Sequence, residues 1–376
     1  MRIVRDVLRY VVRHVARLVA QLVARLVAGL GRRPHEAAAL RREVGRRGAL
    51  GVLLSLALPL IILVLSGCAS LTSGVAPFDA PELSRNPRLI VATTRKPANG
   101  ARAKPWFGAE RASAMTFARA KLVPPDDGRF SLSSIGLGDW SLEAVEPVAR
   151  LGDLLPSGPE PRDVLLYVHG FNQTFETAAL DAARLSDGIR FRGETMVFSW
   201  PSKAKLFDYG YDRESAMWSR DELERVLSLL MASPAVGRIH VVAHSVGTML
   251  SMESLRQIYA RHGIAVTDKI GAVIFASPDI DMDVFTSSVE RIPPLAPKIT
   301  VITATNDRAL AVAGWLAGGT TRVGAAEKSQ LEKLGLRVID ASTEGWGLIN
   351  HDLFLSNADI RLVIRHAVEG VPPDHS

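Results

Sequence analysis

Short apolar runs alternate with longer amphipathic stretches along this 376-residue chain, most regularly from residue 163 onward. Each short run predicts a buried strand, and apolar positions three or four apart predict a helix. Strands and helices in alternation are typical of parallel β-α-β units with helices on both faces of one sheet. The predicted strands lie near residues 89–94, 163–169, 195–200, 238–243, 270–276, 298–305 and 336–341. The predicted helices span residues 174–187, 213–232, 246–261, 306–316 and 355–368.

Residues 95–162 interrupt this alternation because they are rich in glycine, proline and serine. They predict an early hairpin followed by a surface loop. Residues 87–370 then make a segment of about 280 residues, which suits a single α/β domain with a full core. We therefore predict the α/β fold class, with a mostly parallel central sheet.

The amino-terminal region has the architecture of a secretory signal. Residues 49–64 are apolar and uncharged, and Arg46 and Arg47 precede them. The small residues Ser66 and Gly67 then lead to Cys68. A basic region, an apolar region and small residues before a cleavage point, followed by this cysteine, predict a bacterial lipoprotein signal. The alternative is an uncleaved membrane anchor, for which the apolar run is only marginally long enough.

Cys68 is the single cysteine of the chain, so it has no partner for an intramolecular disulfide. It stands where a lipoprotein carries the thiol that receives diacylglycerol. We expect residues 1–67 to be the leader, residues 68–86 a linker after the lipidated cysteine, and the membrane to be a partner. By resemblance to lipoprotein sorting signals, Ala69 in place of an acidic residue favours the periplasmic face of the outer membrane over the inner membrane.

The first 48 residues are long for a signal, and arginines recur every fourth position from Arg5 to Arg17 and again at Arg25. Valines and leucines cover the other side, which predicts a cationic amphipathic helix on an anionic membrane surface. The alternative is a start codon assigned too far upstream, with translation beginning near residues 41–44. Residues 1–40 would then be absent from the natural product.

Charge is divided unevenly along the chain. Residues 1–67 hold twelve arginines and three acidic residues, a net charge of +9, so the remainder carries −3 of the total of +6. A mildly acidic mature protein excludes a basic nucleic-acid-binding domain. The histidines are scattered and no metal-binding motif occurs, so neither a metal nor a cofactor is expected. The sequence does not decide the oligomeric state.

The apolar run from Val241 ends in Ala243-His244-Ser245-Val246-Gly247. A serine between small residues at a strand-to-helix corner predicts a nucleophile elbow, in which side chains at the flanking positions would strike the neighbouring backbone. Ala243 occupies a position where glycine is usual. The alternative is a surface serine that caps the following helix.

Two further residues complete the expected catalytic triad. Asp307 and His351 follow Ser245 in the order nucleophile, acid and base, and each lies past the end of a predicted strand. In open parallel sheets, the reactive groups gather beyond the carboxyl ends of the strands. Asp279 and Asp281 also follow a strand and are the alternative acids, unless they serve in helix capping and loop hydrogen bonds.

The run from Asp163 to Gly170 predicts a buried strand that leads into Phe171 and Asn172. We expect the backbone N–H groups of Phe171 and Val246 to form an oxyanion hole. Gly170 would allow close approach of the chain to the substrate. His169 precedes the nucleophile and is expected to orient this loop rather than to act as the base.

Several motifs give the chain a resemblance to the α/β-hydrolase family of bacterial esterase-like and lipase-like proteins. They are residues 167–172, Phe198-Ser-Trp-Pro-Ser202, Tyr209 with Asp212, residues 243–247, 277–281 and 306–310, and His351. The resemblance runs from about residue 87 to about residue 369. It implies the α/β-hydrolase fold and a hydrolytic triad. At position 204 the resemblance leads us to expect glycine, where this chain has alanine.

The expected activity is cleavage of an ester through an acyl-enzyme on Ser245. Only some twenty residues separate the predicted strand at 270–276 from the next, so we expect no large lid domain and a fairly open pocket. Such a pocket favours small or medium esters, or acyl groups at a membrane surface. Trp200 is expected either to line the pocket or to pack at a strand end, with His244 and Asn172 as further loop support. A thioesterase, amidase or acyltransferase would use the same residues, and a noncatalytic lipoprotein scaffold is the more distant alternative.

Overall fold

The computed structural model describes residues 88–99, 103–125, 140–307, 310, 313–314, 320–342 and 353–371. Every described residue belongs to the unit Thr72–Ser376. The predicted leader, Cys68 and the linker after it lie outside the described residues. No helix in the described part combines the length and the apolar character that a membrane crossing requires.

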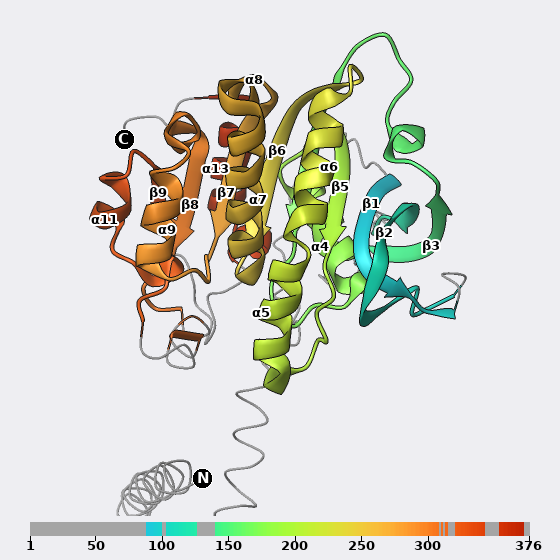
Figure 1. The fold of residues 1–376 in the computed structure, drawn as a ribbon, viewed down its shortest axis with the longest axis horizontal. Helices are drawn as coiled ribbons and strands as arrows, with labels where there is room; N and C mark the ends of the chain where they lie inside the picture. Colours follow the sequence, from blue (N-terminus) through green and yellow to red (C-terminus); the bar gives the residue numbers. More distant parts are fainter. Residues whose placement is uncertain are drawn as a thin grey trace, which may run out of the picture. The chain divides into compact units, whose positions relative to one another are not determined.

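The described residues form a nine-stranded sheet in the order β3-β2-β1-β5-β4-β6-β7-β8-β9 (Figure 1). All neighbouring pairs from β1 to β9 in this order are parallel, and β2 and β3 are antiparallel additions at one edge. The seven strands predicted from the apolar runs are all confirmed. The strands are β1 Arg88–Pro97, β2 Phe107–Val123, β3 Ser141–Val148, β4 Arg162–Val168, β5 Glu194–Ser199, β6 Val236–His244, β7 Ile270–Ala276, β8 Ile299–Thr303 and β9 Arg337–Asp340.

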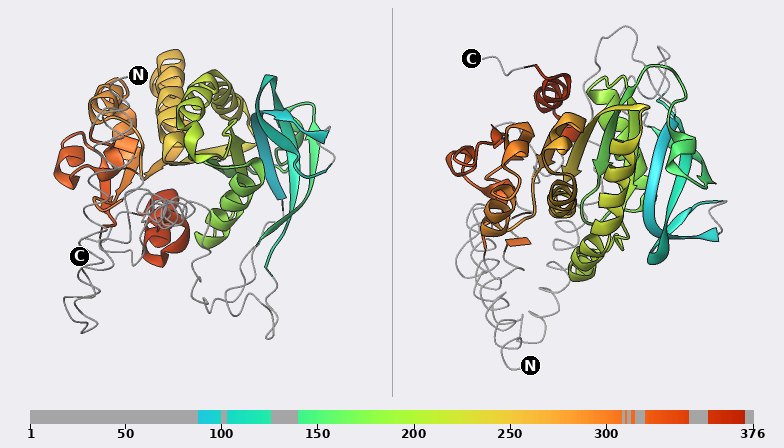
Figure 2. Two further views of the ribbon diagram at one scale, coloured as in Figure 1. Left: turned by 90° about the horizontal axis from the view of Figure 1, so that it is seen from below. Right: turned by 45° about the horizontal axis from the view of Figure 1, so that its top comes forward.

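Helices cover both faces of the sheet, as the alternating pattern predicts. α6, α7 and α9 pack on one face, and α4 and α13 pack on the other (Figure 1, Figure 2). The α-helices of the described residues are α4 Phe175–Gly188, α5 Tyr209–Trp218, α6 Arg220–Ala232, α7 Val246–His262, α8 Val266–Lys269, α9 Met282–Val289, α11 Lys328–Glu332, α12 Leu353–Ser356 and α13 Ala358–Glu369.

Each face of the sheet carries its own apolar layer. On β4, Leu166 and Val168 join one layer, whereas Leu165 and Tyr167 join the other. Successive side chains of a strand point to opposite faces, so a continuous apolar run supplies both layers at once. The first layer includes Leu250 of α7, which begins directly after Ser245. Burial of this layer therefore fixes the helix that carries the predicted nucleophile at its start.

Two predicted helices are interrupted. The stretch expected at 213–232 begins earlier, at Tyr209, and divides at Ser219, whose N–H bonds back to both Ser215 and Ala216. The stretch expected at 355–368 divides at Asn357, whose side chain caps α13 by accepting from the N–H groups of Asp359 and Ile360. Amphipathic spacing continues across both breaks, so periodicity does not reveal them. Most of the helix expected at 306–316 lies outside the described residues.

The region that the sequence predicts as hairpin and loop contributes two strands. β1 and β2 form the expected antiparallel hairpin, and β3 pairs with β2 where a surface loop was predicted. β2 alternates clearly between buried and exposed positions only toward its end, and half of the residues of β3 are exposed, so neither gives a strong apolar pattern. Residues 277–298, between β7 and β8, hold only α9 and the 3₁₀ turn Pro293–Lys298. No large lid domain occurs there, as predicted.

Strand register brings the predicted site loops together. β4 lies between β5 and β6, and Val168 at its end pairs with Ala243, two residues before Ser245. In the same way His244 pairs with Ala276, and Ala276 pairs with Ile302. The carboxyl ends of these parallel strands therefore form one edge, beyond which ligands bind in open α/β sheets. Helix α5 begins at this edge (Figure 1).

Candidate active site

Ser245 occupies the sharp corner between β6 and α7. Its backbone has φ +50° and ψ −121°, which is a strained conformation for a residue with a side chain. Its N–H donates to the Ala276 carbonyl at 3.0 Å, and its own carbonyl accepts from the N–H groups of Thr248 and Asp279. The serine is buried, and its side chain makes no capping hydrogen bond. This geometry is that of an elbow and not that of a surface helix cap.

Steric crowding requires small residues around the elbow. A methyl group on Gly247 would lie 2.3 Å from the carbonyl oxygen of His169 and 2.7 Å from that of Val168. A side chain at this position would therefore force α7 away from the loop after β4. Ala243 is a fully buried member of β6, where a methyl group packs in the apolar layer instead of striking the turn. This explains why alanine serves where glycine is usual.

The loop after β4 is held by His169, which is fully buried. Its Nδ1 lies 2.8 Å from the Gly170 carbonyl oxygen, and its Nε2 lies 3.2 Å from that of Trp200. The imidazole also stacks on the Trp200 ring, with 4.7 Å between ring centroids. A neutral imidazole donates from one ring nitrogen only, so one of these two carbonyl oxygens accepts a hydrogen bond from it, and Ser199 Oγ lies 3.4 Å from Nε2. The buried ring therefore links the loop after β4 to the end of β5, and its orienting role stays a prediction.

Burial, with a smaller contribution from the charge of Arg95, lowers the pKa of His169 to about 3 from 6.5. Between those two values the unfolded chain binds a proton at this residue that the folded protein does not. The free energy of unfolding should therefore fall as the pH falls below 6.5, by roughly 1.4 kcal/mol for each pH unit from this residue. Urea unfolding at pH 7, 6 and 5 measures this slope.

The control for this prediction is His169→Gln, which should show a shallower fall over the same range even if it is less stable at pH 7. Burial also lowers the pKa of His240, which adds a slope of the same sign to both proteins. A wild-type stability that stays level between pH 7 and pH 5, or identical slopes for the two proteins, would contradict a neutral buried His169.

The expected oxyanion donors are backbone N–H groups on the two segments beside Ser245. A methyl group on Gly170 would lie 2.9 Å from His244 Nδ1 and 3.0 Å from the Ser245 Cβ, so the loop passes very close to the elbow. The next residues are Phe171, whose N–H has no acceptor among the described residues, and Asn172, which has φ +62°. Val246 opens α7, and the first N–H groups of a helix have no intrahelical acceptor. Both expected donors are thus available amides.

Asp307 follows β8 and is buried, with 2 % of its surface exposed. Its N–H donates to the Ala304 carbonyl at 3.0 Å, and its Oδ1 accepts from the Leu310 N–H at 3.2 Å. The carboxylate is therefore fixed in a turn beyond the same edge of the sheet as Ser245. His351, the predicted base, lies outside the described residues.

The two alternative acids have other contacts. Asp281 caps α9, because its Oδ1 accepts from the N–H groups of Asp283 and Val284, which is the capping role left open by the sequence. Asp279 is buried in an ion cluster: it accepts from the Tyr209 hydroxyl at 2.6 Å and lies 3.2 Å from Arg322 Nε. A second arginine, Arg213, lies 3.8 Å from it. Burial and the Asp279 charge raise the pKa of Tyr209 to about 12, so this phenol keeps its proton.

The remaining predicted support residues are built into the protein interior. Trp200 is fully buried, and its Nε1 donates to the His169 carbonyl at 2.8 Å. Of the two roles expected for it, these contacts favour packing at the strand end. His244 is buried against the Phe354 ring, with 4.7 Å between ring centroids.

Strained backbone is concentrated at this edge of the sheet. Asn172, Ala204, Ser245 and Ser277 all have positive φ, and they follow β4, β5, β6 and β7 respectively. The φ of +52° at Ala204 explains why glycine is expected at that position. Non-glycine residues adopt such angles at a cost, and they persist where the surroundings over-determine them, often at functional sites. The strained residues thus lie at the same edge of the sheet as Ser245 and Asp307.

Sequence reasoning missed two buried charged residues beside these loops. Arg95 lies in β1 with 1 % of its surface exposed, and Asp212 in α5 is fully buried. The sequence contained one signal for Arg95, a charge directly after the apolar and β-branched residues of the first predicted strand. Asp212 belonged to the family resemblance without a role. Both contact the loops after β4 and β5.

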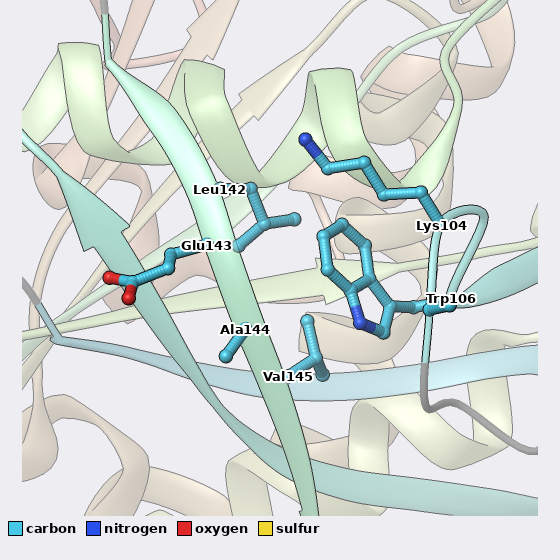
Figure 3. Close-up of a pocket in the computed structure, with 7 residues that line it drawn as sticks. Lys104, Trp106, Leu142, Glu143, Ala144 and Val145 are labelled. Atoms are coloured by element: carbon cyan, nitrogen blue, oxygen red, sulfur yellow. The ribbon is translucent and has the colours of Figure 1, made fainter.

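The described residues also form a hollow that lies apart from this edge of the sheet. A hollow of about 340 Å³ lies beside the edge strand β3, between Trp106 and Leu142–Val145 (Figure 3). Four strands of the sheet order lie between β3 and β6. No group of three or more histidine, cysteine, aspartate or glutamate side chains in the described ranges is placed to hold a metal ion.

Comparison with known proteins identifies the family. Residues 149–367, more than half of the chain, match the family described as "Alpha/beta hydrolase of unknown function (DUF900)". The chain belongs to this family. Its match includes the strands from β4 to β9 and the whole candidate site, and it confirms the α/β-hydrolase resemblance seen in the motifs.

An uncharacterized protein of Nostoc sp. strain PCC 7120 is 36% identical over 122 residues, which cover 26% of this chain and 32% of the relative. The chain thus spans about a third of the length of this curated relative.

Solved structures share lower identity. An uncharacterized protein from Bacillus cereus ATCC 10987 is 11% identical with a TM-score of 0.38, covering 59% of this chain and 62% of its own. The esterase Est1E from Butyrivibrio proteoclasticus is 13% identical with a TM-score of 0.34, covering 68% of this chain and 93% of its own. The catalytic core of an acetyl xylan esterase from Trichoderma reesei is 10% identical with a TM-score of 0.34, covering 55% and 98%. The family match, and not these structures, carries the assignment.

Proposed function

We propose that this α/β hydrolase cleaves an ester through an acyl-enzyme on Ser245, with His351 as the base and Asp307 as the acid. The observation that carries the proposal is the strained elbow at Ser245. Gly170, which precedes the Phe171 amide, passes so close to this elbow that a methyl group on it would lie 3.0 Å from the Ser245 Cβ. A buried serine held at φ +50° beside two available N–H groups combines a nucleophile with an oxyanion site.

The proposed reaction has two matched halves. The Ser245 hydroxyl attacks the ester carbonyl carbon while His351 accepts its proton, and the Phe171 and Val246 amides receive the oxyanion. Collapse of this intermediate breaks the bond to the alcohol, which leaves with the proton from His351. Water then attacks the acyl-enzyme in the same way, releasing the acid and restoring the serine. Asp307 would hold the imidazole in the tautomer that accepts from Ser245.

A fluorophosphonate probe tests this assignment because it reacts covalently with an activated serine. We expect the purified mature protein to be labelled and the Ser245→Ala variant to remain unlabelled. Ser251→Ala is the matched control, since this serine is buried on the same helix and its hydroxyl has no partner in the described structure. Absence of labelling in folded wild-type protein would reject the hydrolase proposal in favour of a noncatalytic scaffold.

We also propose that the protein is anchored to the bacterial cell envelope by a lipid on Cys68. The support is the sequence pattern of the leader, in which the single cysteine follows an apolar run and small residues. Expression of Cys68→Ser in a bacterial host should move the protein from the detergent-extracted membrane fraction to the soluble or unprocessed precursor pool. Equal membrane association of correctly processed wild type and Cys68→Ser would contradict lipid anchoring at this residue.

A further inference from the structure

Arg95 is a buried cation with hydrogen bonds to several separate segments. β1 pairs with β5 in a register that sets Thr93 opposite Ser199, so Arg95 lies beside the end of β5. A buried guanidinium requires hydrogen-bond acceptors to offset its lost hydration. The guanidinium donates to Ser199 Oγ at 2.8 Å and to the carbonyl oxygens of Gln173 at 2.7 Å, Ser202 at 2.9 Å and Gly108 at 3.1 Å.

Asp212 binds the same two loops from the other side. Its Oδ2 accepts from the Ser202 hydroxyl at 2.5 Å, and its Oδ1 accepts from the Lys203 N–H at 2.8 Å. The backbone N–H of Asn172 also contributes a hydrogen bond to this carboxylate. Ser202 thus joins the two charges, since its carbonyl accepts from Arg95 while its hydroxyl donates to Asp212.

The charges of the two residues complement each other. Burial lowers the pKa of Arg95 to about 10, and the charges of Asp212 and Glu176 oppose this fall, so the guanidinium remains charged near pH 7. Burial raises the pKa of Asp212, against the hydrogen bonds from Ser202 and Lys203. We call Arg95, Ser202 and Asp212 the loop clamp.

The loop clamp holds the peptide groups that follow Phe171. The Asn172 N–H is engaged by Asp212, the Gln173 N–H by the Ser202 hydroxyl at 3.2 Å, and the Gln173 carbonyl by Arg95. On the other side of Phe171, His169 contacts the Gly170 carbonyl. The Phe171 N–H is left without an acceptor among the described residues.

We propose that the loop clamp positions the Phe171 N–H toward the oxyanion that forms on Ser245. This inference rests on the proposed function and assigns positioning residues for it. None of the three side chains is required to touch the substrate, because their effect passes through the Asn172–Gln173 backbone. An oxyanion donor acts only when it is preorganised at the place where charge develops. A displacement of about 1 Å can cost about 100-fold in rate.

The test measures p-nitrophenyl acetate hydrolysis by Arg95→Lys, Ser202→Ala, Asp212→Asn and the Arg95→Lys/Asp212→Asn double variant. We expect kcat to fall by about 10- to 100-fold with KM within about threefold, because the lost interaction acts mainly in the transition state. The kcat losses of Arg95→Lys and Asp212→Asn should be strongly non-additive in the double variant, since both residues hold one loop. Arg119→Lys is the matched control, an exposed arginine on β2, and should retain wild-type kcat.

A second readout separates positioning from stability. Phenylboronic acid forms a tetrahedral adduct on an active serine, so its inhibition constant should rise in proportion to the loss of kcat/KM in each clamp variant. Near-ultraviolet circular dichroism selects the variants that retain native packing. Ser202→Ala keeps both buried charges and the carbonyl bound by Arg95, and so provides a folded variant when Arg95→Lys or Asp212→Asn unfolds.

Two outcomes overturn the proposal, and they differ from failure of the hydrolase assignment. Folded clamp variants with wild-type kcat would show that the loop needs no clamp. Losses of kcat without a matching change in phenylboronic acid inhibition would indicate general destabilisation. If the hydrolase assignment itself is wrong, wild-type protein shows neither fluorophosphonate labelling nor Ser245-dependent hydrolysis, before any clamp variant is compared.

Discussion

Replacing Ser245 with alanine is expected to reduce kcat for p-nitrophenyl acetate by about a million-fold. The hydroxyl is the proposed nucleophile, and no other serine is held in the elbow of β6 and α7. His351→Ala should lose nearly as much, because an unactivated hydroxyl is a weak nucleophile. The double variant should be no slower than either single variant, since the two residues act as one unit.

Residual activity in these variants carries information about the oxyanion site. Catalysis of about 10³- to 10⁴-fold over water should persist, supplied by the backbone amides and substrate binding. Ser251→Ala again serves as the control and should retain full kcat. Retention of more than a tenth of wild-type kcat in folded Ser245→Ala protein would contradict the nucleophile assignment.

Asparagine at position 307 is expected to reduce kcat by about 10⁴-fold with little effect on folding. The amide keeps the size of the carboxylate, but it can stabilise the wrong tautomer of the catalytic imidazole. Its Oδ1 contact with the Leu310 N–H survives the substitution, which preserves the turn. Steady-state kinetics on the purified variant, with its melting temperature, measure both effects.

The matched comparison is Asp279→Asn, which we expect to lower stability strongly and kcat only slightly. Loss of this charge leaves Arg322 buried without its carboxylate partner, which should reduce the free energy of unfolding by about 3–5 kcal/mol. Folded Asp279→Asn protein should keep kcat within about tenfold. Asp281→Asn should be nearly silent, because asparagine is also a strong helix cap. Full activity of Asp307→Asn, with a large kcat loss in Asp279→Asn, would make Asp279 the catalytic acid in place of Asp307.

The strands that hold the site could be predicted because their signal is local. Val164 to Val168 and Val241 to Ala243 are buried on both faces of the sheet, so their apolar character is continuous along the chain. The elbow is also local, since close backbone packing at Gly247 requires a glycine in the motif itself. In contrast, β3 gains its place mainly by pairing with β2, and its exposed residues give little pattern to read.

The roles of individual polar residues depended on distant partners. Asp279 and Asp281 look equivalent in sequence, yet one forms an ion cluster with Arg322 and the other caps α9. Trp200 could line a pocket or pack in the core, and its stacking on His169 favours the core. Neither Arg322 nor His169 is near its partner in the chain, so no motif records these contacts.

The sequence by itself determined the α/β fold, the order of the parallel strands along the chain and the position of the serine elbow. It could do so because burial on both sheet faces and steric crowding at a turn both constrain neighbouring residues. Only the tertiary structure decided that Arg95 and Asp212 act on one loop, because strand pairing joins residues 95, 173, 202 and 212 across more than a hundred positions of the chain. A buried charge pairs with groups that are close to it in space, and these groups can lie at any separation along the sequence.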